Sequence, residues 1–245
     1  MDRIAPTRRP SGKVVGYQSW RDLLFLHWPV AEEVLRPLVP EALSLDTFDG
    51  QAYIGLVPFA MANVRPWWWP RALSFQFLET NLRTYVHIDG RDPGVYFFSL
   101  EAASWLAVKV ARWRWHLPYF HARMTLERSG RRLRYASERR GPDNPRVEID
   151  CHIDQELGPS RADTLEHFLF ERYLLHVVRR RRLLTGQVHH TPYPVWRAVV
   201  EHCEEQLITA AGLPPPDGPP ALAHFSPGVD VELFALGPQA DRDPP

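Results

Sequence analysis

Alternating positions of the segment 77–86 carry side chains that could do chemistry. An extended backbone puts Phe77, Glu79, Asn81, Arg83 and Tyr85 on one face and the side chains between them on the other. A buried carboxylate, amide and guanidinium must pair with one another or meet a ligand. We therefore predict Glu79, Asn81 and Arg83 as ligand-binding residues. A solvent-facing strand with a Glu79–Arg83 surface ion pair is the alternative.

Glu101, Tyr119 and His121 are candidates for proton transfer. Glu101 ends the apolar run 96–100, where it could be a buried acid or base facing Arg83, or a helix-start acid favoured by the helix dipole. Tyr119 and His121 share one face of a predicted strand, and histidine titrates near neutrality.

His27 follows an apolar run, and we predict it as a ligand-binding residue. For His27 and His121 alike, a hydrogen-bonded structural histidine is the alternative.

Lys109 lies in an apolar stretch that could depress the pKa of its amine and make it a nucleophile. A lysine whose stem packs while its tip reaches water is the alternative. Metal ligands are not expected. The pairs Cys151-His152 and His189-His190 point to opposite faces of a strand, and the chain has no CxxC, HxH or HExxH motif.

The composition excludes several classes of partner. The 29 basic and 29 acidic residues balance, so neither nucleic acid nor an anionic membrane is expected to bind. No segment approaches the ~18 apolar residues of a membrane helix. Arg8-Arg9 lacks the apolar region of an export signal, and Cys151 and Cys203 cannot form a disulfide framework. We expect a cytoplasmic protein with free thiols.

The elements that must position these residues are mostly strands. Asp49-Gly50 and Asp89-Gly90 lie between apolar or β-branched runs, which strongly favours hairpins, and Ser129-Gly130 joins two further strands. Residues 147–153 alternate like a half-buried strand. These patterns predict an α+β, mainly β fold on a closed or strongly curved antiparallel sheet.

Three segments favour helix: 30–38, 102–112 and 164–175. The last has an apolar stripe, and Ser160 and Asp163 have the spacing of a capping box. The arginines at 179–182 would then neutralise the end of that helix and meet solvent.

One domain is expected over residues 14–236, with flexible ends at 1–13 and 237–245. The prolines of 213–220 predict a stiff extended loop before a last short strand. The run Trp67-Trp68-Trp69 could cover a pocket or contact another subunit, so a homo-oligomer stays open.

Residues 35–46 resemble the opening segment of acetoacetate decarboxylases. A longer resemblance, over about residues 17–235, is to their uncharacterised relatives, the YqjF-like conserved bacterial proteins. The segments that carry it are, in order, 24–29, 46–50, 55–59, 81–86, 94–100, 117–124, 171–173, 186–190 and 225–231. The resemblance implies an antiparallel, barrel-like sheet with peripheral helices and an internal cavity for a small molecule.

The resemblance does not extend to the lysine of the decarboxylases. Those enzymes form a Schiff base within G-R-E-L-x-x-Y-P-K-K. The corresponding stretch here is 98–109, where Glu101 matches the glutamate but the Y-P-K-K part is missing. Lys109 falls one or two positions late and has no lysine neighbour.

Two functions remain, and neither needs a cofactor. The first is a barrel that binds a small anionic or aromatic metabolite without turnover. The alternative is a cofactor-independent lyase acting on a small keto or carboxylic acid. In the lyase, Arg83 would hold the carboxylate and Glu101 with His121 or Tyr119 would move protons. Any imine would rest on Lys109, since the only other lysine is Lys13 in the N-terminal arm.

Overall fold

The computed structural model describes residues 1–105, 117–141, 143–179 and 182–238, and within them the chain is mainly β. The strands are β1 (Gly16–Val30), β2 (Ser44–Leu45), β3 (Ala52–Pro66), β4 (Phe75–Ile88), β5 (Arg91–Ala102), β6 (Tyr119–Ser129), β7 (Arg132–Arg139), β8 (Arg146–Gly158), β9 (Leu174–Arg179), β10 (Arg182–His189), β11 (Val195–Glu205), β12 (Leu222–Leu233) and β13 (Gly237–Pro238). The helices are η1 (Ala5–Thr7), α1 (Glu32–Leu35), η2 (Arg36–Leu38), η3 (Arg71–Leu73), α3 (Leu165–Phe170) and α4 (Leu207–Ala210).

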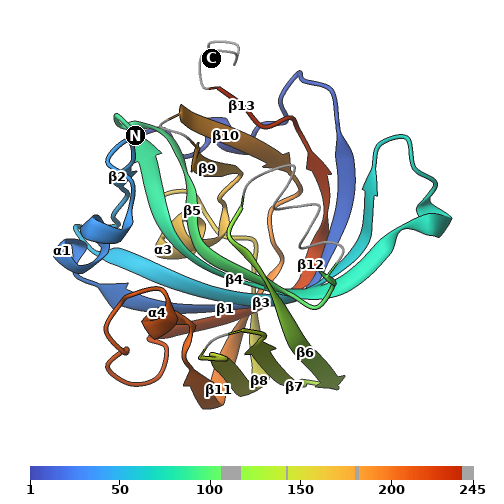
Figure 1. Ribbon diagram of the computed structural model, residues 1–245, viewed down its shortest axis with the longest axis vertical. Helices are drawn as coiled ribbons and strands as arrows, with labels where there is room; N and C mark the ends of the chain where they lie inside the picture. The colour runs from blue at the N-terminus through green and yellow to red at the C-terminus, as the bar shows by residue number, and fades with distance from the viewer. Residues whose placement is uncertain (106–116, 142, 180–181, 239–245) are drawn as a thin grey trace.

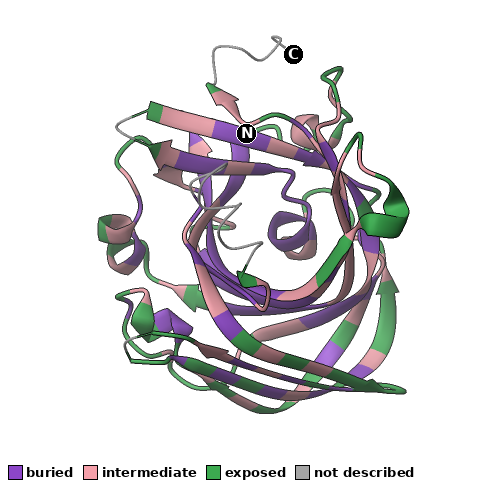
Figure 2. Cartoon of the chain, turned by 45° about the vertical axis from the view of Figure 1, so that its right-hand side comes forward, coloured by how far each residue is buried: buried purple, intermediate pink, exposed green. Residues whose placement is uncertain are grey.

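All these strands join one strongly curved sheet, in the order β13-β10-β9-β5-β6-β7-β8-β11-β12-β1-β3-β4-β2. Because β10 also pairs with β12 and β5 with β4, the pairings β12–β1–β3–β4–β5–β9–β10 return to β12. A second circuit runs through β6, β7, β8 and β11 and shares β12, β1, β3, β4 and β5 with the first. Figures 1 and 2 show α3 on the inner side of the first circuit.

The sheet is mixed, so the prediction of an antiparallel sheet is wrong in two places. Strand β5 runs parallel to β6 and also to β9, with Leu100 opposite Tyr119 and Val95 opposite Leu175. The prediction considered hairpins, which join antiparallel neighbours. Parallel strands need longer connections, and such connections leave no turn motif in the sequence.

The predicted turns form as expected at two positions. Asp89-Gly90 joins β4 to β5, and both residues have positive φ, of 48° and 76°. Ser129-Gly130 joins β6 to β7, with Gly130 at φ 61°. Asp49-Gly50 also makes a tight turn, closed by a bridge between the flanking residues, but the strand before it, β2, pairs with β4.

The helices are shorter than predicted. Residues 30–38 contain α1 and η2, whereas α3 ends at Phe170 because the chain enters β9 at Leu174. Thr164, and not Ser160, caps α3: its hydroxyl accepts from the His167 amide at 3.3 Å. Arg179 and Arg182 therefore pair with each other where β9 and β10 meet, and not at a helix end. Ala102 belongs to β5, and most of the predicted helix 102–112 lies outside the described residues.

The circuit around α3 encloses an aromatic core. Phe168 and Phe170 of α3 pack with Phe25, Tyr85 and Tyr193 in a cluster that is almost completely buried. A second cluster of mainly aliphatic side chains fills the space between the long strands and β7, β8 and β11. The two clusters lie on opposite faces of β1, β3 and β4, which explains why these strands are buried over much of their length (Figure 2).

Residues 1–13, for which the composition predicts a loose arm, contact the sheet in the structure. A guanidinium nitrogen of Arg3 lies 2.5 Å from a carboxylate oxygen of Asp46, and Arg9 pairs with Glu232 at 2.6 Å. The proline-rich residues 213–220 form a loop before β12, as predicted. No helix in the described part of the chain is long and apolar enough to span a membrane.

Candidate functional site

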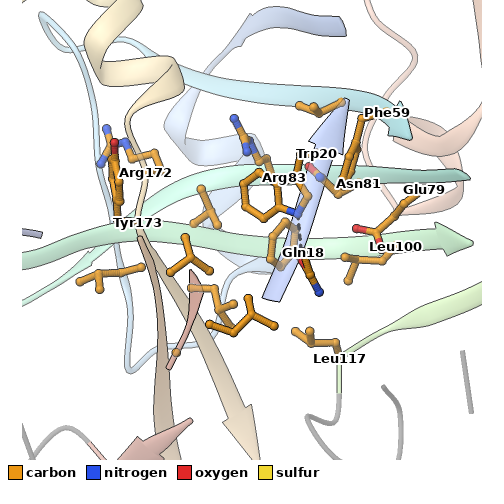
Figure 3. A pocket seen from close by; sticks show the side chains of 18 of the residues that line it. Gln18, Trp20, Phe59, Glu79, Asn81, Arg83, Leu100, Leu117, Arg172 and Tyr173 are labelled. Atoms are coloured by element: carbon orange, nitrogen blue, oxygen red, sulfur yellow. Dashed lines mark hydrogen bonds between the residues drawn. The ribbon is translucent and has the colours of Figure 1, made fainter. Parts of the chain in front are cut away.

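A cavity of about 140 Å³ lies inside the circuit of strands, beside the end of α3 (Figure 3). Apolar and aromatic side chains form most of its wall, including Trp20, Phe59, Phe97, Leu100 and Leu117. The polar side chains that line it are Gln18, Glu79, Asn81, Arg83, Tyr119, Arg172, Tyr173, Gln187 and Tyr193. An apolar wall with a few inward polar groups is the usual composition of a small-molecule site.

Strand β4 supplies three of the polar side chains. Glu79, Asn81 and Arg83 all line the cavity, as the alternation of the sequence predicts, and Figure 3 shows them along one strand. The intervening Thr80 and Leu82 face the other way, Leu82 into the aliphatic cluster and Thr80 against Tyr135. The surface-strand alternative for Glu79 and Arg83 is excluded, since both are buried and the described ion pairs include no contact between them.

Arg83 is a buried cation without a counter-ion among the described residues. Its side chain is 8% exposed, and Nη2 donates to the Leu169 carbonyl at 3.1 Å. Its Nε is buried and has no described hydrogen-bond partner. The guanidinium also lies 5.7 Å from the Phe25 ring centroid and 5.8 Å from that of Tyr85, so aromatic faces stabilise part of its charge.

Arg172 is the second guanidinium of the cavity wall, and it is paired. Its Nη1 lies 2.7 Å from Asp46, and Nε donates to the Phe168 carbonyl at 2.6 Å. Asp46 also forms an ion pair with Arg3, so one carboxylate is the partner of two arginines. Figure 3 places Arg172 and Tyr173 at one end of the cavity and Glu79, Leu100 and Leu117 at the other.

Glu79 is the acidic group of the cavity. It is 2% exposed, and its Oε2 accepts a hydrogen bond of 2.8 Å from the Tyr119 hydroxyl. Burial raises the pKa of Glu79 to about 8, the Tyr119 hydrogen bond lowers it in part, and the nearby Glu101 raises it further. At neutral pH the carboxyl group is therefore mostly protonated and uncharged.

Asn81 lies between these two ends. Its Oδ1 is buried without a described hydrogen-bond partner. On β1, Trp20 Nε1 donates to Gln18 Oε1 at 2.8 Å, so this pair is satisfied within the wall.

Glu101 lies on the opposite face of the sheet from the cavity, so the predicted contact with Arg83 is wrong. It is fully buried and forms an ion pair with Arg139 and a 3.2 Å hydrogen bond with Ser99. The cause is a register shift between β4 and β5: Leu82 pairs with Ser99, but Arg83 pairs with Phe97. The extra residue reverses the alternation of β5, turning Phe97 and Leu100 into the cavity and Glu101 away from it.

Neither predicted histidine lines the cavity. His121 is half-buried on β6, where it lies opposite Ala102, the last residue of β5. His27 is fully buried, and burial lowers its pKa well below the usual value. Because the Tyr85 hydroxyl donates to the Leu169 carbonyl at 3.0 Å, it accepts from His27 Nε2 at 2.7 Å, which assigns a neutral imidazole protonated at Nε2. His27 thus matches the structural alternative.

Lys109 lies outside the described residues, and Lys13 is exposed. Sequence reasoning missed five polar side chains of the wall: Gln18, Arg172, Tyr173, Gln187 and Tyr193. For Arg172 and Tyr173 a signal existed, because they fall within a short segment that supports the family resemblance, but the predicted helix 164–175 hid their position next to strand β9. Trp67 and Trp68 are 63% and 61% exposed at the β3–β4 connection and do not line the cavity.

Solved structures with a similar fold include several proteins of the acetoacetate decarboxylase type. The enduracididine biosynthesis enzyme MppR, solved in complex with pyruvate, has a TM-score of 0.63 at 12% identity, covering 92% of this chain and 91% of that one. An acetoacetate decarboxylase has a TM-score of 0.63 at 14% identity over 97% and 98% of the two chains. An acetoacetate decarboxylase-like enzyme from Sphingomonas wittichii RW1 has a TM-score of 0.61 at 13% identity over 91% of each.

The sequence comparisons are more specific. The uncharacterized protein YqjF of Bacillus subtilis strain 168 is 38% identical over 228 residues, which cover 93% of each chain. The family model DUF2071, described as an uncharacterized conserved protein, matches residues 17–230. The predicted relationship is thereby confirmed: the chain belongs to the DUF2071 family, with YqjF as a relative and the fold of acetoacetate-decarboxylase-like proteins.

Proposed function

We propose that this protein binds a small organic carboxylate in the cavity, with Arg83 as the partner of the carboxylate. The observation that supports this most directly is the buried guanidinium of Arg83, which lines the cavity and forms no ion pair with a described carboxylate. A buried charge without a counter-ion is costly. An anionic ligand would supply the missing charge, and guanidinium and carboxylate match in a two-pronged contact.

The neighbouring guanidinium strengthens the case for an anion. Among the described ion pairs, Asp46 is the one acidic partner of both Arg3 and Arg172, and Arg83 has none. This end of the cavity therefore carries an excess of positive charge. Electrostatic attraction inside a low-dielectric wall is stronger than at the surface.

The volume and the wall limit the size of the ligand. An engineered apolar cavity of about 150 Å³ holds benzene, and this cavity is about 140 Å³ with aromatic side chains around it. We infer that the ligand is a carboxylate with a body of about one ring or a short chain, enclosed by the barrel-like circuit of strands. Pyruvate in the structural neighbour MppR belongs to the same chemical class.

A ligand screen with two arginine variants tests the proposal. Small carboxylates should raise the Tm of the unaltered protein, because a ligand that binds only the folded state stabilises it. Arg83→Gln should remove the shift. Arg197→Gln, which changes an exposed arginine of β11, should retain it. Equal shifts in Arg83→Gln and in the unaltered protein would refute the role of Arg83.

A cofactor-independent lyase acting on a small keto or carboxylic acid is the second candidate. The observation that favours it is that a carboxylic acid and a phenol, Glu79 and Tyr119, lie in the same cavity as Arg83. Such a pair could move a proton next to a bound carboxylate.

Product analysis separates turnover from binding. Each stabilising ligand is incubated with the protein and recovered, and a ligand recovered unchanged supports binding alone. For a keto acid, an imine forms on Lys109 with loss of water, and borohydride reduction should then leave an adduct with the mass of the ligand less one oxygen atom. The variant Lys109→Met is the control. Trapping without an adduct excludes the imine route.

A further inference from the structure

The proposed carboxylate site occupies only one end of the cavity. Arg83 and Glu79 are four residues apart on β4, which separates their Cα atoms by about 13 Å in an extended strand. Arg172 and Tyr173 lie at the Arg83 end, and Leu100 and Leu117 lie near Glu79 (Figure 3). A ligand held at Arg83 therefore extends its other end towards Glu79.

Among the described residues, no positive charge lies at the Glu79 end to receive a second anion. The one described hydrogen bond of Glu79 comes from the uncharged Tyr119 hydroxyl, and no described ion pair includes Glu79. A buried carboxyl group without a cation is more stable in its neutral form. With Oε2 accepting from Tyr119, the acid proton lies on Oε1, which no described residue bonds.

We propose that Glu79, as a neutral carboxylic acid held by Tyr119, determines the specificity of the cavity by donating a hydrogen bond to an uncharged oxygen at the end of the ligand remote from its carboxylate. This rests on the proposed carboxylate binding at Arg83. The cavity then takes monoanions that carry a distant carbonyl, ester or hydroxyl oxygen. It rejects dianions of the same length, because a second carboxylate would need to lose its hydration beside a carboxyl group, with no cation among the described residues to pair with it.

The described groups around Glu79, on both faces of β4, are neutral or already paired. Tyr119 on β6 and Tyr135 on β7 have pKa values raised by burial, so both stay neutral. Glu101 on β5 lies on the other face and is paired with Arg139. The pairing partner on β3 is Phe59, which has no charge. Loss of the Glu79 proton as the pH rises past about 8 should therefore weaken ligand binding.

Three rigid probes of similar shape test the proposal: benzoate, 4-acetylbenzoate and terephthalate. Their dissociation constants are measured by calorimetry at pH 6.5 and pH 9.5. At pH 6.5 the acetyl compound should bind about 5-fold more tightly than benzoate, the gain of one hydrogen bond, and at least 10-fold more tightly than terephthalate. At pH 9.5 its advantage over benzoate should disappear. Pentanoate, 4-oxopentanoate and glutarate repeat the comparison without a ring.

Variants at Glu79 separate this inference from the proposed function. Glu79→Gln keeps a neutral donor, so it should retain the preference for the acetyl compound and lose its pH dependence. Glu79→Leu should bind benzoate and 4-acetylbenzoate equally. If terephthalate binds as tightly as 4-acetylbenzoate, while Arg83→Gln weakens both, the inference on Glu79 is wrong and the carboxylate site stands. If Arg83→Gln weakens none of the probes, the proposed function fails, and this inference with it.

Discussion

Two buried polar regions lie on opposite faces of β4 and β5, and they differ in how completely their groups are paired. On the face away from the cavity, Glu101 binds Arg139 and Ser99, and Thr80 binds Tyr135. On the cavity face, Arg83 Nε and Asn81 Oδ1 have no described partner. A satisfied buried network stabilises a fold. The unsatisfied groups facing the cavity are those that the proposed ligand would pair, so the pairing of a buried group is more informative than its burial.

The largest expected effect comes from the pH dependence of the cavity face. With a folded-state pKa of about 8 and an ordinary value near 4.5, folded Glu79 keeps its proton between these pH values while unfolded Glu79 loses it. Stability should fall as the pH rises through this window, by as much as ~4 kcal/mol, and then level off. Glu79→Gln should remove this fall. Urea unfolding from pH 5 to pH 9 measures both, and parallel curves for the two proteins would contradict the assignment.

Breaking the ion pair between Arg139 and Glu101, on the face away from the cavity, should lower the free energy of unfolding by nearly as much. Arg139→Met leaves Glu101 buried beside no cation, and removing one member of a buried pair typically costs ~3–5 kcal/mol. Arg134→Met, also on β7, breaks an exposed ion pair with Asp150 and should cost under ~1 kcal/mol. Chemical denaturation of both variants makes the comparison. Equal losses would mean that Glu101 does not depend on Arg139.

Tyr135→Phe should have a smaller effect on the same face. It removes the hydroxyl that bonds Thr80 and leaves a buried threonine hydroxyl without that partner. The expected loss is ~1–2 kcal/mol in the free energy of unfolding. In the double variant with Thr80→Val the two changes should be less than additive. Full additivity would show that the two hydroxyl groups are not coupled.

Arg83→Gln should change stability least and ligand binding most. The guanidinium has no described carboxylate to leave unpaired, so the free energy of unfolding without ligand should change by under ~1 kcal/mol. A loss of several kcal/mol, comparable with Arg139→Met, would show that Arg83 is structural and would remove the contrast between the two faces.

Local patterns in the sequence were sufficient to predict which side chains of β4 share the cavity face. The side-chain period of a strand is two, so the cavity face of Glu79, Asn81 and Arg83 could be predicted without knowing the partner strands. Glu101 of β5 was assigned from its place at the end of an apolar run, and the register shift opposite Arg83 turns it to the other face. A bulge depends on the pairing of two strands, and neither strand alone reveals it.

The remaining residues of the site depend on contacts between distant segments. Tyr119 reaches Glu79 because β6 lies parallel to β5, and the chain returns to that position without a turn motif. Arg172 enters the wall because α3 ends at Phe170, before the predicted end at 175. The family resemblance predicted the type of fold, but it could not assign these contacts.

The contact of Arg3 with Asp46 has a practical consequence for the design of expression vectors. Arg3 is near the N-terminus, yet its partner Asp46 also holds Arg172 of the cavity wall. A chain that starts beyond Arg3 would lack a positive charge close to the cationic end of the cavity. The affinity measured for an anion would then depend on where the expressed chain starts. Comparing the unaltered protein with an Arg3→Gln variant would measure how strongly this charge affects the affinity.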